Sequence, residues 1–448
     1  MKNQMKYTFL IALILVSGSL RAQQQTPVTP EMVKQEFLHC WNAYKKYAWG
    51  HDDVKPLTKS YRDWHKHSLL MTPVDAFDTM VLMGLKDESK EAKELILDSL
   101  SFDRDMEVQS FEITIRLLGG LLSAYQFDGD KRFLALADDL GKRLLPVYNT
   151  PTGMPYRFVN LQTGKLRDSL NNPAEIGTAL IEFGTLSKLT GKQEYYDKPK
   201  NAMVQLFNRR SKIGLVGSTI NVVTGEWTDT TSYIGGGIDS YYEYLLKSWR
   251  LFGDPDCKAM WDSTIAAVNT YVADDRGGRL WYGEVGMNSG VRTGTEFGSL
   301  EAFFPAVLAL SGDMDRAQKL EASCFTMWNL YGIEPEEINY QTMTVTDSVY
   351  VLRPEIIESA FYLKHFTHEK EYTQMGETFY RNLVRYCRVD GGYARLKNVV
   401  TREQSDRQDS FFLAETLKYL YLLVSQDNAF DFEHLTFNTE AHPIRRTW

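Results

Sequence analysis

An apolar segment with helical spacing, a short polar turn and a returning segment recur along this chain about every 60 residues. The apolar segments lie at 75–85, 111–127, 175–189, 239–252, 296–310, 355–366 and 409–423. The returning segments have one polar face, as KRFLALADDLGKRLL at 131–145 illustrates. A helix that is apolar all round is buried, whereas a two-faced helix borders solvent. The repeat therefore predicts seven helical hairpins, with inner helices enclosed by outer helices.

The repeat length favours a closed barrel over an open helical spiral. Tetratricopeptide and ankyrin repeats have periods near 33 or 34 residues, and HEAT repeats have periods of about 40 to 47. The longer period here, together with very apolar inner segments, predicts an all-α barrel. The segment 31–49 is expected to form one further outer helix. The expected turns between paired helices lie at 86–89, 128–131, 190–193, 253–256, 311–315, 367–371 and 425–428.

Two segments break the helical pattern. Residues 153–168 and 218–230 alternate apolar and polar side chains around Thr-Gly turns. This alternation predicts small β-hairpins in the connections between repeats. Because no low-complexity linker interrupts the chain, we expect one domain over residues 28–448.

The N-terminal segment has the order of a targeting signal. Lys2 and Lys6 precede a run of about ten apolar residues at 7–16, and small residues follow up to Ala22. This order predicts a secretory signal peptide over residues 1–22, cleaved after Ala22. An uncleaved anchor is the alternative, although the run is short for a membrane span. We expect export to the periplasm or the medium, with no membrane span in the mature chain.

The overall charge is acidic. Lys and Arg number 50 against 58 Asp and Glu, a formal charge of −8 that the loss of three basic residues with the signal peptide would take to −11. An acidic chain does not favour a nucleic-acid partner, which usually selects for a basic surface. The eight histidines form no HExxH motif, and no CxxC pair occurs, so neither a zinc site nor a disulfide is predicted. The four cysteines are Cys40, Cys257, Cys324 and Cys387.

Each apolar segment carries an acidic residue at or next to its start. These residues are Asp75, Glu112, Glu175, Asp239, Glu296, Glu355 and Asp409. Equivalent positions in seven hairpins would place them at one mouth of a barrel. Helix capping, worth roughly 0.3–1 kcal/mol, explains any one of them. It does not explain Glu358 and Glu415, which lie about one turn further along their helices, so the pattern predicts a crowded carboxylate site.

Such a mouth suits two kinds of chemistry. Carboxylate oxygens bind hard cations such as Ca²⁺. A carboxylic acid and a carboxylate facing each other across a sugar can also hydrolyse a glycosidic bond. Neighbouring aromatic residues would either stack on sugar faces or belong to the core. They are Phe111, Tyr241, Tyr242, Phe411 and Phe412.

Several strings together resemble glycoside hydrolase family 47, the class I α-1,2-mannosidases. They are AWGHDDVKPL, TPVDAFDTM, FEITIRLLGGLLSAY, DSYYEYLLK, LRPEIIES, DSFFLAETLKYLYLL and FNTEAHP, in order between residues 40 and 443. The resemblance implies an (α/α)7 barrel. It also implies an inverting, exo-acting and Ca²⁺-dependent hydrolase that removes terminal α-1,2-linked mannose from mannose-rich glycans.

The resemblance also implies roles for individual residues. Glu112 in FEITIR matches the catalytic acid, which acts directly or through a water. Asp239 and Glu355 match the other two catalytic carboxylates, with Glu355 as the base that activates water and Asp239 as the competing assignment. Thr439 in FNTEAHP matches a threonine that binds Ca²⁺ through its hydroxyl and carbonyl oxygens. The positions implied to surround the sugar and the metal are Arg116, Arg353, Glu358, Asp409 and Glu440.

This sequence departs from the family pattern at four positions. Ala302 stands where a cysteine is expected, which leaves Cys324 without its usual disulfide partner. Ser299 replaces a frequent site histidine, and Asp409 replaces a longer glutamate. Gly237 occupies a position whose bulk influences which mannose branch is accepted. These changes bear on branch preference and rate rather than on the class of reaction.

Three other interpretations remain open at this stage. One is an endo-acting, mannan-degrading hydrolase or a lyase on an α/α barrel. The second is a glycan-binding protein that has lost its chemistry. The third is a purely structural helical repeat, which would not need acidic residues at every inner-helix start.

Overall fold

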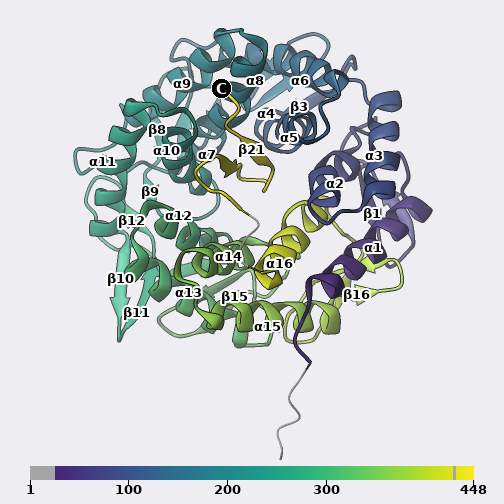
Figure 1. Cartoon of the computed structure of the whole chain (residues 1–448). Helices are drawn as coiled ribbons and strands as arrows, with labels where there is room; N and C mark the ends of the chain where they lie inside the picture. The colour runs from purple at the N-terminus through teal and green to yellow at the C-terminus, as the bar shows by residue number, and fades with distance from the viewer. Residues whose placement is uncertain (1–25, 427–429) are drawn as a thin grey trace, which may run out of the picture.

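The computed structural model describes residues 26–426 and 430–448, which form a closed ring of paired helices (Figure 1). In this part of the chain, seven inner helices line the ring: α2 (Met71–Leu82), α5 (Gly119–Asp128), α8 (Leu180–Thr190), α10 (Asp239–Phe252), α12 (Phe304–Ser311), α14 (Glu355–Thr367) and α16 (Leu417–Val424). Seven outer helices enclose them: α1 (Pro30–Tyr47), α3 (Lys86–Ser99), α6 (Lys131–Leu144), α9 (Glu194–Phe207), α11 (Pro255–Tyr271), α13 (Met314–Asn329) and α15 (Lys370–Tyr386). Neighbouring inner helices pack in chain order around the ring. The predicted all-α (α/α)7 barrel is confirmed.

Burial separates the two rings as the hydrophobic pattern predicted. In α12, every residue from Phe304 to Leu310 is buried. In α6, one stripe that includes Phe133 and Leu140 is buried, while the opposite face reaches solvent. The turn between α5 and α6 follows its sequence: Gly129 takes a left-handed conformation (φ 82°), and the Asp130 side chain accepts a hydrogen bond from the first turn of α6.

The seventh pair and the first turn differ from the prediction. The helix that packs outside α16 is the N-terminal α1, so the expected extra outer helix at 31–49 completes the seventh pair. The ring closes where the π-helical turn Phe412–Thr416, which leads into α16, packs on α2. The turn expected at 425–428 lies partly outside the described residues. Residues 86–89 are not a turn but the start of α3, because acidic side chains there stabilise a helix N-terminus.

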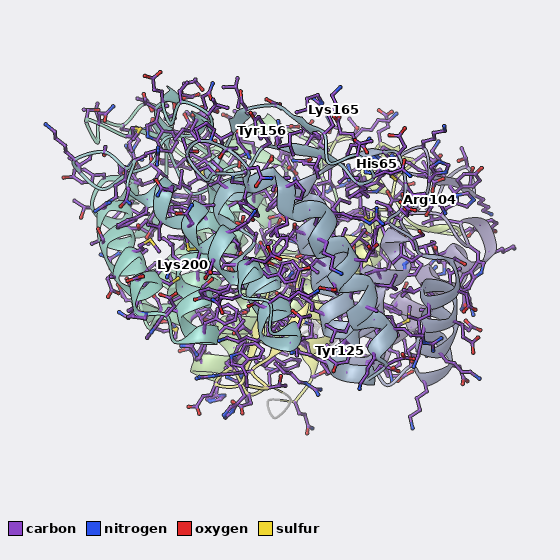
Figure 2. All side chains as sticks on the ribbon, turned by 90° about the horizontal axis from the view of Figure 1, so that it is seen from above. His65, Arg104, Tyr125, Tyr156, Lys165 and Lys200 are labelled. Carbon is purple, nitrogen blue, oxygen red and sulfur yellow. The ribbon has the colours of Figure 1, made fainter. Side chains whose placement is uncertain are left out.

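Small antiparallel sheets occupy the connections that lead from outer to inner helices. Both predicted hairpins are confirmed, as β4 (Phe158–Asn160) with β5 (Leu166–Arg167) and β7 (Thr219–Asn221) with β8 (Trp227–Asp229). The other strands in these connections are β1 (Asp53–Lys55), β2 (Ser60–Arg62), β3 (Glu107–Gln109), β6 (Leu170–Asn171), β9 (Thr231–Ser232), β10 (Ala273–Arg276), β11 (Arg279–Tyr282), β12 (Val285–Gly286), β13 (Glu296–Gly298), β14 (Glu337–Asn339), β15 (Thr344–Asp347), β16 (Arg388–Val389), β17 (Gly392–Tyr393), β18 (Arg395–Leu396) and β19 (Gln404–Ser405). Figure 2 shows Tyr156 and Lys165 of these connections at one edge of the barrel and Tyr125 of α5 at the opposite edge.

The C-terminal segment enters the ring instead of adding to its outside (Figure 1). Strands β20 (Leu435–Phe437) and β21 (Pro443–Arg445) form an antiparallel hairpin. The first packs on α10 and the second on α5. The turn between them, residues 438–442, therefore reaches the interior of the barrel.

Two further predictions concern the membrane and the cysteines. Within the described residues, no helix combines the length and apolar character needed to cross a membrane. The four cysteines, for which the spacing predicts no particular pairing, are all buried and unpaired. The predicted signal peptide, residues 1–22, lies outside the described residues.

Candidate active site

A cavity of about 450 Å³ opens where several inner helices begin. Its wall is formed by side chains from the starts of inner helices, by the connection before α10 and by the turn 438–442. Eight of the lining residues are acidic: Glu112, Glu175, Asp239, Glu243, Glu355, Glu358, Glu415 and Glu440. Three other lining residues are arginines: Arg116, Arg157 and Arg353. The cavity thus carries a formal excess of five acidic groups over arginines.

The structure brings together residues that are far apart in the sequence. Eight of the nine predicted site residues line this cavity: Glu112, Arg116, Asp239, Arg353, Glu355, Glu358, Thr439 and Glu440. They come from the second, fourth and sixth inner segments, from the connection just before the sixth segment (Arg353) and from the C-terminal turn. The volume lies within the range typical of small-molecule sites.

Asp409, the ninth predicted site residue, is not among the residues that line the cavity. This residue precedes the helical turn of the seventh inner segment, and its side chain is 2% exposed. Its oxygens accept hydrogen bonds from Arg395 Nε at 2.5 Å and Arg407 Nε at 2.6 Å, so two guanidinium groups hold it outside the cavity. Glu415, six residues later, lines the wall instead.

The predicted ring of helix-start acids is incomplete. Glu296 belongs to strand β13, and the fifth inner segment becomes helical only at Leu300. Asp75 is buried within α2 and does not line the cavity. Glu243 was missed, although it follows Asp239 by four residues and therefore shares its face of α10. The four-residue spacing from Asp239 is the sequence signal that identifies Glu243 as a candidate.

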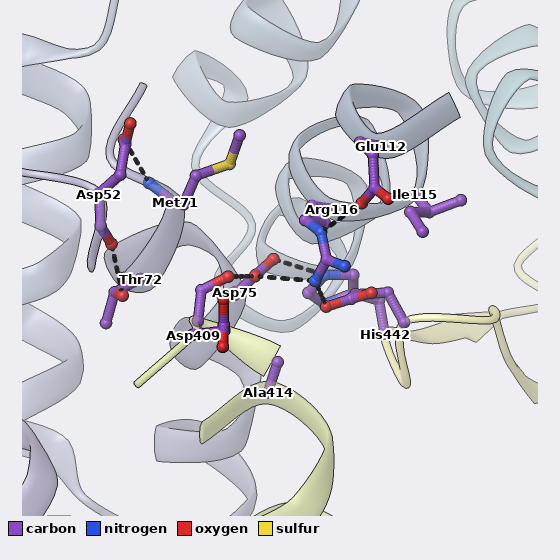
Figure 3. A network of polar contacts seen from close by, with 12 residues as sticks. Asp52, Met71, Thr72, Asp75, Glu112, Ile115, Arg116, Asp409, Ala414 and His442 are labelled. Carbon is purple, nitrogen blue, oxygen red and sulfur yellow. Dashed lines mark hydrogen bonds and ion pairs between the residues drawn. The ribbon is translucent and has the colours of Figure 1, made fainter. Parts of the chain in front are cut away.

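Glu112 and Arg116 share one face of a short helical stretch. Helix α4 (Ser110–Ile113) continues into the π-helical turn Thr114–Leu118, so the two side chains meet. Arg116 Nε donates to Glu112 Oε2 at 2.9 Å, and Arg116 Nη1 also pairs with Glu440 Oε1 (Figure 3). Burial raises the pKa of Glu440 to about 8, although Arg116 lowers it. Arg116 therefore links an acid of α4 to an acid of the C-terminal turn.

Asp239 and Glu355 are the first residues of α10 and α14. Burial raises the pKa of each carboxyl to about 7, and Arg353 opposes the rise in both. Arg353 Nη1 lies 3.9 Å from Glu355 Oε1. Glu355 Oε2 is buried and has no hydrogen-bond partner among the described residues. Carboxyls with these pKa values can gain or lose a proton near neutral pH, as general acid–base catalysis requires.

The cavity residues fit a hard cation. Their possible ligands are oxygen atoms, with no His or Cys among the lining residues, and the acidic groups outnumber the arginines. Thr439 lies on the wall at the tip of the C-terminal turn, where its backbone N–H donates to the Tyr244 hydroxyl at 3.2 Å. These donors match the preference of Ca²⁺ for oxygen.

A cation in the cavity would have few protein ligands. Among the described residues, three His, Cys, Asp or Glu ligand atoms within 4.8 Å of one another occur only at the exposed Asp431, Glu433 and His434. The cavity acids therefore form no compact cluster of three ligand atoms.

A closed α/α barrel whose cavity holds carboxyls on separate helices fits the two-carboxylate chemistry of a glycoside hydrolase. Residues 36–446 match the model of glycosyl hydrolase family 47, and the chain belongs to this family. The resemblance found in the sequence and the enzyme class are confirmed.

Similar proteins span almost the whole chain. Alpha-mannosidase I MNS5 of Arabidopsis thaliana is 37% identical over 444 residues, which cover 93% of this chain and 76% of that protein. The human mannosyl-oligosaccharide 1,2-alpha-mannosidase IB is 36% identical over 446 residues, covering 92% and 69%. The solved alpha-1,2-mannosidase from Trichoderma reesei superposes with a TM-score of 0.85 at 26% identity, covering 93% of this chain and 98% of that one.

Proposed function

We propose that this chain is an exo-acting, inverting and Ca²⁺-dependent α-1,2-mannosidase that releases terminal mannose from mannose-rich glycans. One observation carries the proposal: Glu112, Asp239, Glu355 and Thr439, from four distant segments, line one cavity. The printed names of the relatives describe α-1,2-mannosidases, which supports the same linkage for this chain.

The acid and base roles follow from the requirements of inversion. An inverting glycosidase protonates the leaving oxygen with one carboxylic acid and activates a water with a carboxylate about 6.5–9.5 Å away. Glu112 acts as the acid, directly or through a water. Glu355 acts as the base because its buried, unpartnered Oε2 is free to accept a proton. Asp239 remains the competing base, since burial raises the pKa of both carboxyls to about 7.

The metal proposal rests on the oxygen donors and on the excess acidic charge. Thr439 would hold the ion through its hydroxyl and carbonyl oxygens. Bound Ca²⁺ would supply a positive charge that binds sugar hydroxyls and favours a distorted ring. Arg116 holds Glu112 and Glu440 in place beside that position, while Arg353 limits the protonation of Glu355.

The C-terminal hairpin supports exo action. Strands β20 and β21 occupy the interior of the ring, and their turn contributes Thr439 and Glu440 to the cavity wall (Figure 1). A glycan can present its end to such a cavity but cannot thread through the barrel. This arrangement supports attack at a chain end, and the substrate that we propose is a terminal mannose.

The test is NMR spectroscopy of α-1,2-mannobiose during hydrolysis, with Ca²⁺ and with a chelator. We expect β-mannose as the first product in Ca²⁺ and loss of activity in the chelator. Initial α-mannose would refute inversion, and full activity in the chelator would refute the metal requirement. Binding without release would favour a glycan-binding protein, and internal cleavage of longer mannans would favour an endo-acting enzyme.

We also propose that the chain is exported. The basic, apolar and small-residue order of residues 1–22 supports export. Intact-mass measurement of protein recovered outside the cytoplasm tests the proposal. We expect a mature chain that begins at Gln23, and a retained Met1 would refute cleavage.

A further inference from the structure

The C-terminal turn contains two buried side chains that the proposed chemistry does not use, Asn438 and His442. Asn438 Oδ1 accepts hydrogen bonds from the backbone N–H groups of Glu440 at 3.0 Å and His442 at 2.7 Å. Asn438 Nδ2 donates to the carbonyl of Ile115 at 2.9 Å. Asn438 therefore shapes the turn and ties it to the π-helical turn that carries Arg116.

His442 ties the same turn to helix α2. Its Nδ1 donates to Asp78 Oδ2 at 2.7 Å, and its Nε2 lies 3.4 Å from Asp75 Oδ1. Lys418 Nζ lies 2.6 Å from Asp78 Oδ1 and donates to the carbonyl of Ala441 at 2.6 Å. These side chains are at most 1% exposed, so two cations and two carboxylates neutralise each other inside the barrel.

The neighbours of His442 favour the protonated imidazole. Burial lowers the pKa of His442, but the adjacent Asp78 and Asp75 raise it further, to about 9. A doubly protonated ring carries an N–H on each nitrogen, so it can hydrogen bond to Asp78 through Nδ1 and form an ion pair with Asp75 through Nε2.

The bridge leads directly to the proposed acid. Asp75 Oδ2 lies 3.8 Å from Arg116 Nη1, and Arg116 in turn pairs with Glu112 and Glu440 (Figure 3). A displacement of His442 would therefore shift the partner of Arg116 and the turn that carries Glu440 together.

Two adjacent glycines make room for this arrangement. A Cβ atom at Gly119 would lie 2.6 Å from Asn438 Nδ2. A Cβ atom at Gly120 would lie 3.1 Å from His442 Cε1 and 2.8 Å from Val74 Cγ1. The Gly-Gly pair of the second inner segment thus allows the close approach of the C-terminal turn.

We propose that His442 is a positioning residue that clamps the Thr439–Glu440 turn to α2 and, through Asp75, holds Arg116 against Glu112. The inference rests on the proposed function, because the groups it positions are those of the proposed mannosidase. His442 itself does not line the cavity, so it acts through its neighbours.

His442→Gln tests the clamp, because a glutamine amide carries no charge and cannot bridge both aspartates. We expect kcat for α-1,2-mannobiose to fall about tenfold or more, since misplacement of catalytic groups by about 1 Å can cost 10²-fold. We also expect Ca²⁺ to raise the Tm of His442→Gln less than it raises the Tm of the wild type, with both measured without substrate.

Tyr195→Phe is the matched control. The Tyr195 hydroxyl donates to Asp138 Oδ1 at 2.9 Å between outer helices α9 and α6, away from the cavity. This variant removes a hydrogen bond from a buried side chain and lowers Tm. It should retain the wild-type kcat and the wild-type Ca²⁺ response.

Ser410→Ala provides a milder second variant, because the Ser410 hydroxyl donates to Asp75 Oδ2. We expect a smaller loss of kcat in the same direction. A folded His442→Gln variant with wild-type kcat and Ca²⁺ response would overturn the inference. If that variant does not fold, wild-type kcat in Ser410→Ala would overturn it. A wild-type chain that releases no mannose would instead refute the proposed function.

Discussion

Removal of the Arg353 charge should move the pH dependence of the enzyme toward alkaline pH. Arg353 Nη1 lies 3.9 Å from Glu355 Oε1, and its positive charge lowers the pKa that burial raises. The substitution Arg353→Gln keeps a polar side chain and removes the charge. Glu355 would then be protonated over a wider pH range, and a protonated carboxyl cannot act as a base.

The magnitude follows from the distance. Two unit charges about 4 Å apart interact by about 4 kcal/mol at an effective dielectric constant of about 20, which corresponds to an upper limit of about three pKa units. Solvent in the cavity reduces this interaction, and we take about one unit as the lower limit. A pKa rise from about 7 to about 8 reduces the ionised fraction at pH 7 from about one half to about one eleventh. kcat/KM at pH 7 should then fall about fivefold and recover by pH 9.

The assay is kcat/KM for α-1,2-mannobiose between pH 5 and pH 10, because this profile reports the pKa values of the free enzyme. Arg353→Lys is the matched control, since it retains the charge and should leave the acidic limb near pH 7. An unchanged acidic limb in Arg353→Gln would refute the assignment of Glu355 as the base controlled by Arg353.

Three further predictions concern the acid, the metal and stability. Glu112→Gln should lower kcat by about 10²–10⁴-fold, because it removes a general acid but preserves shape. Initial-rate kinetics check this, and activity like that of wild type would exclude Glu112 as the acid. Thr439→Ala should abolish most of the Ca²⁺-induced rise in Tm, whereas Thr439→Ser, which keeps the hydroxyl, should preserve it; equal responses would remove Thr439 from the metal site. Without Ca²⁺, Tm should fall between pH 5 and pH 8. Burial raises the pKa of Asp239 and Glu355 to about 7 and of Glu358 and Glu440 to about 8, so the folded state binds more protons than the unfolded state in this range. A Tm that rises over this range would contradict the assigned shifts.

The helical repeat predicted most of the fold because burial and periodicity are local properties. All-round apolar segments became inner helices, and two-faced segments became outer helices. The pairing of α16 with α1 could not be predicted in this way. It joins the two ends of the chain, and no local pattern specifies which distant helix closes a ring.

The site was predicted where family resemblance and helix position agree, as for Glu112, Asp239 and Glu355. Asp409 lies outside the cavity wall, because a residue just before a helix can turn its side chain either toward the cavity or toward neighbouring loops. Two arginines from the connection before that helix decide the direction. The sequence places Glu415 beyond the capping turn of its helix, but only the packing of the ring shows that its side chain lines the cavity wall.

The acidic residues gathered in the cavity destabilise the folded state. Burying a carboxylate without a matching cation disfavours its charged form. Three arginines face eight acids on this wall, and buried Lys247 behind it pairs with Glu243 and lies 3.8 Å from Glu358, so acids still outnumber cations. The cluster around His442 is balanced, because the cations His442 and Lys418 face the carboxylates of Asp75 and Asp78. This cluster lies next to the cavity, since Asp75 is 3.8 Å from Arg116. Charge is thus balanced where the chain must be held rigid and left unbalanced where substrate and a cation would bind. Neutralising the cavity with amides should therefore stabilise the fold while removing activity, whereas neutralising the clamp should weaken both.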